Sequence, residues 1–253
     1  MSSASQTYPV DPEVTLVQIT DDALAKVAAA ARVCYAQDES AVLKSLDSAE
    51  PEKDAALIRR VIDMGHLSVI EHISLSFLVR GVSRAMTHQL VRHRLASYSQ
   101  RSQRYVAEDG FGYIVPPRLK GKTVETEDGT EVDAVEYFAQ TMDMLADRYA
   151  RLNDALGRTG ESSNQDARYV LPNACETTIL ITMNARELIH FFGERLCTRA
   201  QWEIRRVTKQ MLALAQEACP VLFERAGPKC VFAGFCPEGE KTCGFYAARE
   251  SGK

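Results

Sequence analysis

Apolar and polar residues alternate over positions 73–80, which indicates a β-strand with one buried face. The polar side carries serines and an arginine, and Gly81 is expected to break the strand. The apolar side is expected to face the core and consists of Ile73, Leu75, Phe77 and Val79.

Helical patterns occupy much of the rest of the chain. An alanine-rich run at 21–36 and the segment 48–65, which ends in a glycine, both predict helices. Ser83 is placed to cap a helix that runs to about Ala96, after which a serine- and glutamine-rich stretch is expected to form a loop. Residues 134–157 predict a long helix.

The second half of the chain predicts two short strands, at residues 166–172 and 177–183. Two capping pairs follow, each expected to open a helix: Asn184 with Glu187, and Thr198 with Gln201. Strands and helices alternate without the regular rhythm of a parallel sheet. The expected fold is therefore α+β, a single domain over residues 1–253 with a central, mostly antiparallel sheet flanked by helices. Within it, residues 120–133 form a polar excursion and the tail 221–253 has no assigned role.

Composition narrows the class of protein. The 253 residues are 45% hydrophobic and 25% charged, as in an ordinary globular protein, and no apolar run approaches the length of a membrane span. The N-terminus lacks the basic and apolar regions of a signal peptide, and an odd number of cysteines, seven, fits a reducing compartment. A cytoplasmic protein without a membrane partner is expected. A formal charge of −4 argues against a general nucleic-acid coat.

Several common cofactor motifs are absent from the sequence. There is no G-x-G-x-x-G that opens a helix, and Pro116 stands where a P-loop ending at 121–123 needs glycine. The tail cysteines Cys230, Cys236 and Cys243 miss the spacing of zinc knuckles, so structural thiols are expected there and no metal site.

A cationic, donor-rich cluster at residues 88–105 stands out in this acidic chain. Guanidinium, hydroxyl and amide groups are natural partners of phosphate oxygens and nucleobase edges. A solvated helix face would have a similar composition. A second set of cations in the other half favours binding of polyanionic ligands by both segments; it consists of Arg168, Arg186, His190, Arg195 and Arg199.

The sequence RHRLASYSQRS at 92–102 matches R-H-R-x₇-S, and on this motif the chain resembles the flavin-dependent thymidylate synthases. The segments GHLSVIEHISLSF at 65–77 and YVLPNACETTILITMNARELIHFFGERLCTRAQWEI at 169–204 resemble the same family in order and spacing. The resemblance covers roughly residues 15–220.

This resemblance implies an enzyme that methylates dUMP to dTMP, with methylenetetrahydrofolate as carbon donor and FAD reduced by NADPH, and that releases tetrahydrofolate. It also implies a homotetramer with active sites between subunits, and no nucleic-acid partner. The alternative is an RNA-binding protein that uses residues 88–105. A relative that binds nucleotide without catalysis is a third possibility.

The resemblance also implies roles for individual residues. The FAD-binding positions are Ser68, Arg92, His93, Arg94, Gln100, Asn184, Arg186 and His190. The dUMP-binding positions are Gln89, Leu90, Val91, Arg92, Gln100, Arg101, Ser102, Gln103, Arg104, Arg168 and Arg195.

Three residues carry the chemical expectations. Ser102 and Arg104 are expected to bind the phosphate, and Ser102 is preferred as an orienting group over a nucleophile because no base is fixed beside it. Arg195 is expected to be catalytic, stabilising the ionised uracil ring, and Gly193 is expected to bend the helix so that Arg195 turns towards the ligand. Gln100 stands where some relatives carry an acid.

Overall fold

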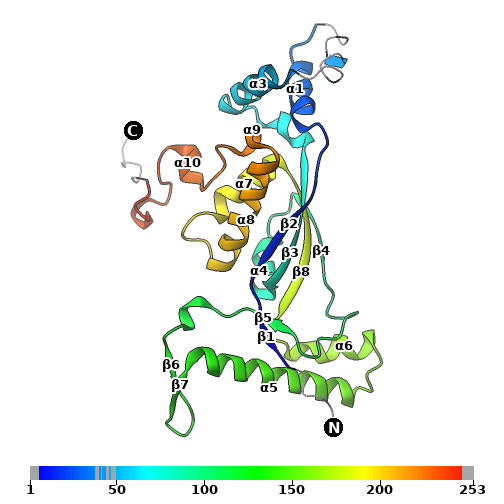
Figure 1. Cartoon of the computed structure of the whole chain (residues 1–253), viewed down its shortest axis with the longest axis vertical. Coiled ribbons are helices and arrows are strands. Elements are labelled where there is room, and N and C mark those ends of the chain that lie inside the picture. The colour runs from blue at the N-terminus through cyan, green and yellow to red at the C-terminus, as the bar shows by residue number, and fades with distance from the viewer. Residues whose placement is uncertain (1–5, 38–39, 41, 44–45, 47–49, 247–253) are drawn as a thin grey trace. The chain divides into compact units, whose positions relative to one another are not determined.

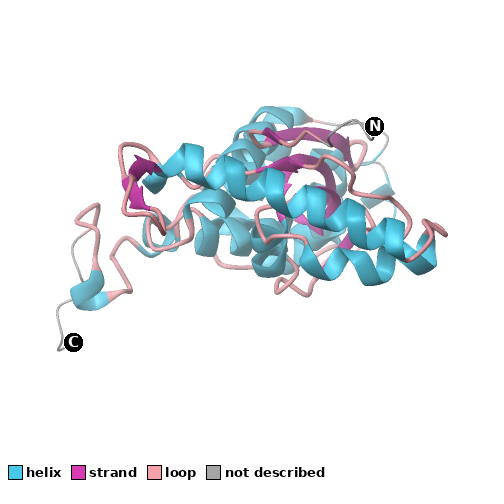
Figure 2. Ribbon diagram, turned by 90° about the horizontal axis from the view of Figure 1, so that it is seen from below, coloured by secondary structure: helices cyan, strands magenta, loops and turns pink. Residues whose placement is uncertain are grey.

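The computed structural model describes residues 6–37, 40, 42–43, 46 and 50–246 (Figure 1). Its main sheet has four strands in the order β2-β3-β8-β4. Helices make up most of the remaining regular structure, as Figure 2 shows. The expected α+β fold with a mostly antiparallel central sheet is confirmed. The strands of this sheet are β2 (Glu13–Ile19), β3 (Ser74–Ser83), β4 (Ala96–Gln100) and β8 (Glu176–Asn184).

Strand β3 follows the predicted alternation, because the four apolar residues of its expected core face are all fully buried. The prediction that Gly81 breaks the strand is wrong, since β3 continues to Ser83. Gly81 has a φ of +63°, and a Cβ there would lie 2.3 Å from the carbonyl oxygen of Asp11. Glycine is therefore needed for close backbone approach within the strand.

The chain forms two compact units, each assembled from separate stretches, and all but one of the boundaries fall within strands of the main sheet. Unit 1 contains the residues up to Glu13, Val79–Val91 and Ser99–Ile179. Unit 2 contains Val14–Leu78, Arg92–Tyr98 and the residues from Leu180 onward. The organisation of residues 1–253 as a single domain stays a prediction.

Unit 1 is built around the long helix α5 (Ala134–Ala155), whose first turn is capped by the Asp133 carboxylate. A small core, which includes Phe111, Met142 and Cys175, packs against it. The polar excursion at 120–133 contains an antiparallel hairpin, in which residues 123–125 pair with residues 131–133. The other elements of unit 1 are β1 (Tyr8–Pro9), α4 (Arg84–Leu90), β5 (Gly112–Tyr113), η2 (Pro117–Leu119), β6 (Thr123–Glu125), β7 (Glu131–Asp133), α6 (Glu161–Ala167) and η3 (Arg168–Val170).

Unit 2 contains a pair of helices, α1 and α3, joined by an ion pair between Arg32 and the buried Asp54. A second group of helices packs through aromatic rings: the Phe192 ring is tilted against Phe191 and meets Phe223 edge to face. The helices of unit 2 are α1 (Ala23–Val33), α3 (Pro51–Asp63), η1 (Leu67–His72), α7 (Ala185–Arg195), α8 (Trp202–Ala218), α9 (Pro220–Phe223), α10 (Lys229–Ala233) and η4 (Gly239–Lys241).

Local predictions around the cationic segments need correction. Ser83 caps α4 by accepting from the Met86 N–H, but the helix ends at Leu90 instead of about Ala96. The stretch expected to form a loop contains strand β4, because its backbone is taken into the main sheet. Residues 166–172 form the end of α6 and the turn η3, so the strand expected there is wrong.

The two caps expected in unit 2 differ in outcome. Asn184 accepts from the Glu187 N–H and opens α7 as expected. Helix α8 is capped by Gln201, which accepts from the Glu203 and Ile204 N–H groups, and not by Thr198.

Replacing Gly81 by alanine is expected to lower the free energy of unfolding, measured by urea denaturation. The left-handed backbone alone costs about 1–3 kcal/mol for a residue with a Cβ, and the clash with Asp11 adds to it. Gly121 is a matched control, because it has a φ of +70° and nothing within 4 Å of an added Cβ. Equal losses in Gly81→Ala and Gly121→Ala would contradict the close approach.

Candidate active site

In unit 1, Gln100 ends strand β4 with its side chain held by two hydroxyl groups. Its amide nitrogen donates to Thr87 Oγ1 of α4 at 3.1 Å and to Thr177 Oγ1 of β8 at 3.3 Å. The next residue, Arg101, donates its backbone N–H to the Thr178 carbonyl at 2.9 Å. Three elements therefore fix where the chain leaves the sheet and enters the segment 101–106.

Ser102 organises the turn that follows. Its Oγ accepts from the backbone N–H groups of Arg104 at 3.2 Å and of Tyr105 at 3.4 Å, and its carbonyl accepts from the Val106 N–H. A hydroxyl used in this way acts as a local cap. No histidine or carboxylate bonds to Ser102 in the described part of the chain, which agrees with an orienting role.

Both arginines of this turn lie against acids. Arg101 Nη2 lies 3.3 Å from Glu108 Oε2, and Arg104 pairs with Glu161. The backbone carbonyl of Arg104 accepts from Asn164 Nδ2 at 3.1 Å, which ties the turn to α6. The acids hold the guanidinium groups in place, and an anionic ligand would compete with them for the same donors.

Glu108 is the most perturbed carboxyl of unit 1. Its side chain is only 3% exposed, and burial raises its pKa to about 7, although the nearby Arg101 guanidinium acts in the opposite direction. Its Oε1 is buried without a hydrogen-bond partner, whereas its backbone N–H donates to the Tyr149 hydroxyl at 3.1 Å. A partly unsatisfied buried carboxyl is favoured in its neutral form.

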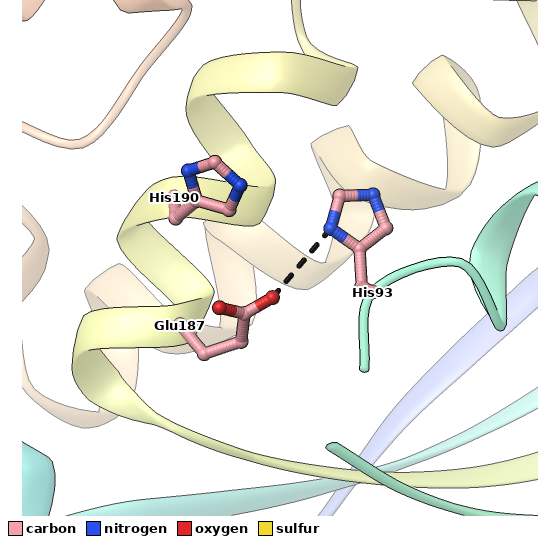
Figure 3. Close-up of side chains that lie close together, drawn as sticks. All are labelled: His93, Glu187 and His190. Carbon is pink, nitrogen blue, oxygen red and sulfur yellow. Dashed lines mark ion pairs between the residues drawn. The ribbon is translucent and has the colours of Figure 1, made fainter. Parts of the chain in front are cut away.

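In unit 2, His93 of the signature lies beside helix α7. Arg195 Nε donates to His93 Nε2 at 2.9 Å. On the other side of the ring, His93 Nδ1 lies 3.5 Å from Glu187 Oε1 (Figure 3). The centroid of the His190 ring lies 6.0 Å from that of the His93 ring, and Phe191 packs edge to face against the imidazole with the ring centroids 4.8 Å apart. The Tyr98 hydroxyl donates to the His93 carbonyl and fixes its backbone.

His93 is neutral in this setting. Burial, followed by the positive charge of Arg195 and the neighbouring His190, lowers its pKa to about 4. Burial also raises the pKa of the Glu187 carboxyl. Because Nε2 accepts from Arg195, the remaining proton of a neutral His93 resides on Nδ1, facing Glu187. The imidazole thus orients the Arg195 guanidinium without bringing a charge of its own.

The α7 helix stays regular through Gly193, so the predicted bend is wrong. Arg195 is the last residue of α7, and it meets His93 with its side chain rather than through a broken backbone. The long arginine side chain, and not a bend at Gly193, therefore brings the guanidinium to His93.

The spacing of His93, Glu187 and His190 would also suit a cation, since their ligand atoms lie within 4.8 Å of one another. The guanidinium of Arg195 already lies against the same imidazole. A metal ion would therefore meet positive charge at this point, and the group is better described as the support of Arg195.

Other predicted flavin positions lie in α7, at the end of β8 and in the turn η1. Arg186 forms an ion pair with Glu71, and Asn184 uses its side-chain oxygen as the α7 cap. Ser68 is exposed and lines an open cavity of about 750 Å³ together with Lys26 and His72. Most of the other side chains on its wall are apolar, and the role of Ser68 in binding FAD stays a prediction.

The remaining predicted positions differ in exposure. The Leu90 side chain is fully buried, so only its backbone is available to a ligand, whereas Val91, Arg92 and Arg94 are exposed. Gln103 is buried and donates to Cys175 Sγ at 3.6 Å. Gln89 lies in the last turn of α4. Arg168 begins η3, and its guanidinium makes no hydrogen bond or ion pair with the part of the chain that the structure describes.

By unit, most of the predicted dUMP positions belong to unit 1, and Arg92 and Arg195 belong to unit 2. The predicted FAD positions belong to unit 2 except Gln100. Sequence reasoning missed the groups that support them: Thr87, Glu108, Glu161, Asn164, Thr177 and, beyond its place in a capping pair, Glu187. No local motif marks these residues, because most of them are separated in sequence from the residues that they contact. Glu108 is closer in sequence to Arg101, but an acidic residue in a loop is not by itself a signal.

Comparison with known proteins places these residues in a family. The model of the family described as thymidylate synthase complementing protein matches residues 15–221. The flavin-dependent thymidylate synthase of Nitratidesulfovibrio vulgaris is 45% identical over 95% of this chain and 98% of its own length. That of Geobacter sulfurreducens is 48% identical over 92% of this chain and 94% of its own.

The chain belongs to the flavin-dependent thymidylate synthase family. A solved structure agrees: the UMP/dUMP methylase PolB of Streptomyces cacaoi, bound with 5-Br dUMP, has a TM-score of 0.69 at 27% identity and covers 90% of this chain and 97% of its own. Family membership favours an enzyme over the RNA-binding alternative. None of the described helices has the length and apolar character needed to cross a membrane, and the cytoplasmic location stays a prediction.

Glu108 is expected to make stability fall as pH rises. Its carboxyl has a pKa of about 7 in the folded chain against an ordinary value of 4.5, so the folded state binds more protons between these pH values. The free energy of unfolding should decrease over this range by on the order of 3 kcal/mol. Urea denaturation at several pH values should show this slope in the wild type and lose it in Glu108→Gln. Glu131→Gln, at an exposed carboxyl, should retain it, and an unchanged slope in Glu108→Gln would contradict the assignment.

Proposed function

We propose that this protein methylates dUMP to dTMP, taking the carbon from methylenetetrahydrofolate and releasing tetrahydrofolate. The observation that carries the proposal is the turn at 101–106, where Arg101, Ser102 and Arg104 gather phosphate-binding groups at the end of a strand. Family membership and the methylase structure bound with 5-Br dUMP support the same substrate.

The turn binds the nucleotide through exchange of partners. Arg104 gives up Glu161, and its guanidinium then donates to the phosphate, whose charge is higher than that of a carboxylate. Ser102 supports this by holding the Arg104 and Tyr105 amides in the turn. Below a pH of about 7 Glu108 is largely neutral, which leaves the Arg101 charge available to the anion.

Arg195 stabilises negative charge on the uracil ring. The ring must become electron-rich to attack the methylene carbon, and a nearby guanidinium favours its ionised form. His93 fixes the direction of the guanidinium through Nε and, being neutral, leaves its charge uncancelled. Arg195 is therefore oriented before the substrate arrives, which lowers the reorganisation needed during the reaction.

FAD is held by Ser68, Arg92, His93, Arg94, Gln100, Asn184, Arg186 and His190. Ser68 and its cavity, together with the cations of α7, fit the hydroxyl and phosphate groups of this cofactor. When bound and reduced by NADPH, FAD supplies the hydride that completes the methyl group. The enzyme works as a homotetramer in which neighbouring subunits complete each flavin pocket.

Arg195→Lys is expected to separate catalysis from binding. Lysine keeps the charge but loses the planar fork and the Nε–H that His93 accepts. The variant should bind FAD normally, seen as flavin absorbance after purification. Its dTMP formation with dUMP, methylenetetrahydrofolate and NADPH should fall by roughly 10²–10³-fold.

The matched control is Arg59→Lys, at an exposed arginine paired with Glu224 outside the site, which should turn over at the wild-type rate. Near wild-type turnover in flavin-loaded Arg195→Lys would remove Arg195 from the catalytic role. A wild-type protein that ignores added FAD but binds RNA at physiological salt would replace the proposal with the RNA-binding alternative.

Ser102→Ala is expected to raise the KM for dUMP more than it lowers kcat. The change removes the acceptor of two backbone amides, so the turn loosens without loss of a reacting group. Steady-state kinetics at saturating folate measure both constants. Complete loss of turnover, with a covalent nucleotide adduct on wild-type Ser102 detected by mass spectrometry, would show that the serine is a nucleophile.

A further inference from the structure

Four cysteines, three of them from the C-terminal tail, line one cavity in unit 2. The cavity has a volume of about 170 Å³, and it lies between the connection of α7 to α8 and the C-terminal tail. Cys230 and Cys236 are buried, and all four cysteines are free thiols. Its thiol-bearing residues are Cys197, Cys230, Cys236 and Cys243. The tail therefore folds back so that three of its thiols meet one from the end of the α7 region.

Charged groups surround the thiols in a pattern that suits thiolates. Lys229 lies beside Cys230 and pairs with Glu238, which also pairs with Arg199. Lys241 lies on the cavity wall as well. Cationic neighbours lower the free energy of thiolates.

We propose that Cys197, Cys230, Cys236 and Cys243 form a tetrathiolate site for a thiophilic metal centre. Sets of four cysteines are the ligands of structural zinc and of iron–sulfur clusters. Each thiol loses its proton as its sulfur bonds to the metal, and the released protons pass to solvent. The site is independent of the flavin and nucleotide positions assigned above.

The size of the cavity favours an iron–sulfur cluster over a single zinc ion. Tetrahedral zinc with Zn–S bonds of about 2.3 Å would bring its sulfurs to about 3.8 Å from one another. Among the described residues, no three of these sulfurs lie all within 4.8 Å of one another. The cavity exceeds the roughly 30 Å³ share of one water several-fold. A [4Fe–4S] cluster keeps its four cysteine sulfurs further apart, because its iron and sulfide ions lie between them.

The centre would fasten the tail to the end of α7. Cys197 follows Arg195 by two residues, and α10, which carries Cys230, packs against α7 (Figure 1). The tail consists mostly of short turns and would gain stability from a cross-link of this kind. The spacing of the tail cysteines did not predict the site, because the fourth ligand, Cys197, precedes α8 in the sequence whereas the other three follow it.

Metal and sulfide analysis of protein purified without oxygen tests the proposal. Wild-type protein should contain either about four iron and four acid-labile sulfide, or one zinc without sulfide, per chain. Cys230→Ser and Cys236→Ser should each lower that content at least tenfold. Cys34→Ser, at an exposed thiol outside the cavity, should leave it unchanged.

Iron with sulfide would support both the site and the cluster. Zinc without sulfide would support the site and replace the cluster with a single ion. If the serine variants do not fold, wild-type protein stripped with a chelator should recover the same content after addition of zinc, or of iron with sulfide. Wild-type protein that holds neither metal as purified or after this treatment would overturn the proposal. The assay needs neither flavin nor dUMP, so its failure is distinct from failure of the proposed enzyme activity.

Discussion

Hydrogen bonding between β3 and β8 sets where the functional helices begin. Strand β3 runs directly into α4, and β8 runs directly into α7. The first N–H groups of a helix lack partners within it. In α4 they are taken by the carbonyls of Cys175 and Asn173, and in α7 the Ala185 N–H is taken by the Ile73 carbonyl at 2.7 Å. A shift of one residue in this pairing would turn every buried side chain of β3 to the opposite face.

Two buried titratable side chains each hold an arginine guanidinium in place. His93 accepts from Arg195, and Glu108 lies against Arg101. Burial moves the pKa of each group in the direction that favours its neutral form, down to about 4 for the histidine and up to about 7 for the glutamate. A neutral acceptor orients a guanidinium by hydrogen bonding while its charge stays available for an anionic ligand.

The sequence predicted those elements that depend on interactions between residues close together in the chain. The alternation in β3, the Ser83 and Asn184 caps and the periodicity of α5 all lie within a few neighbouring residues. Strand β4 escaped prediction because its polar sequence becomes a strand only by pairing in the main sheet. Gly81 escaped because its need for glycine comes from Asp11, which is remote in sequence.

The candidate site divides in the same way. Arg92, Arg94, Arg101 and Ser102 stand in a contiguous signature, so the sequence reveals them. Glu161 and Glu187 pair with residues far along the chain, and nothing beside them in the sequence marks the pairing. The same holds for Cys197, whose neighbours in space come from the tail.

The two threonine hydroxyls that hold the Gln100 side chain can each act as a hydrogen-bond acceptor or as a donor. A threonine hydroxyl can turn its hydrogen away and accept from an amide, as Thr87 and Thr177 do here, or turn it inward and donate to a carboxylate. Glutamine and glutamate occupy nearly the same volume, so this position can exchange one for the other when the two hydroxyls rotate, and the Thr87 hydroxyl then gives up the bond that it donates to the Arg84 carbonyl. The charge at this predicted ligand-binding position can therefore change while the scaffold around it stays as it is.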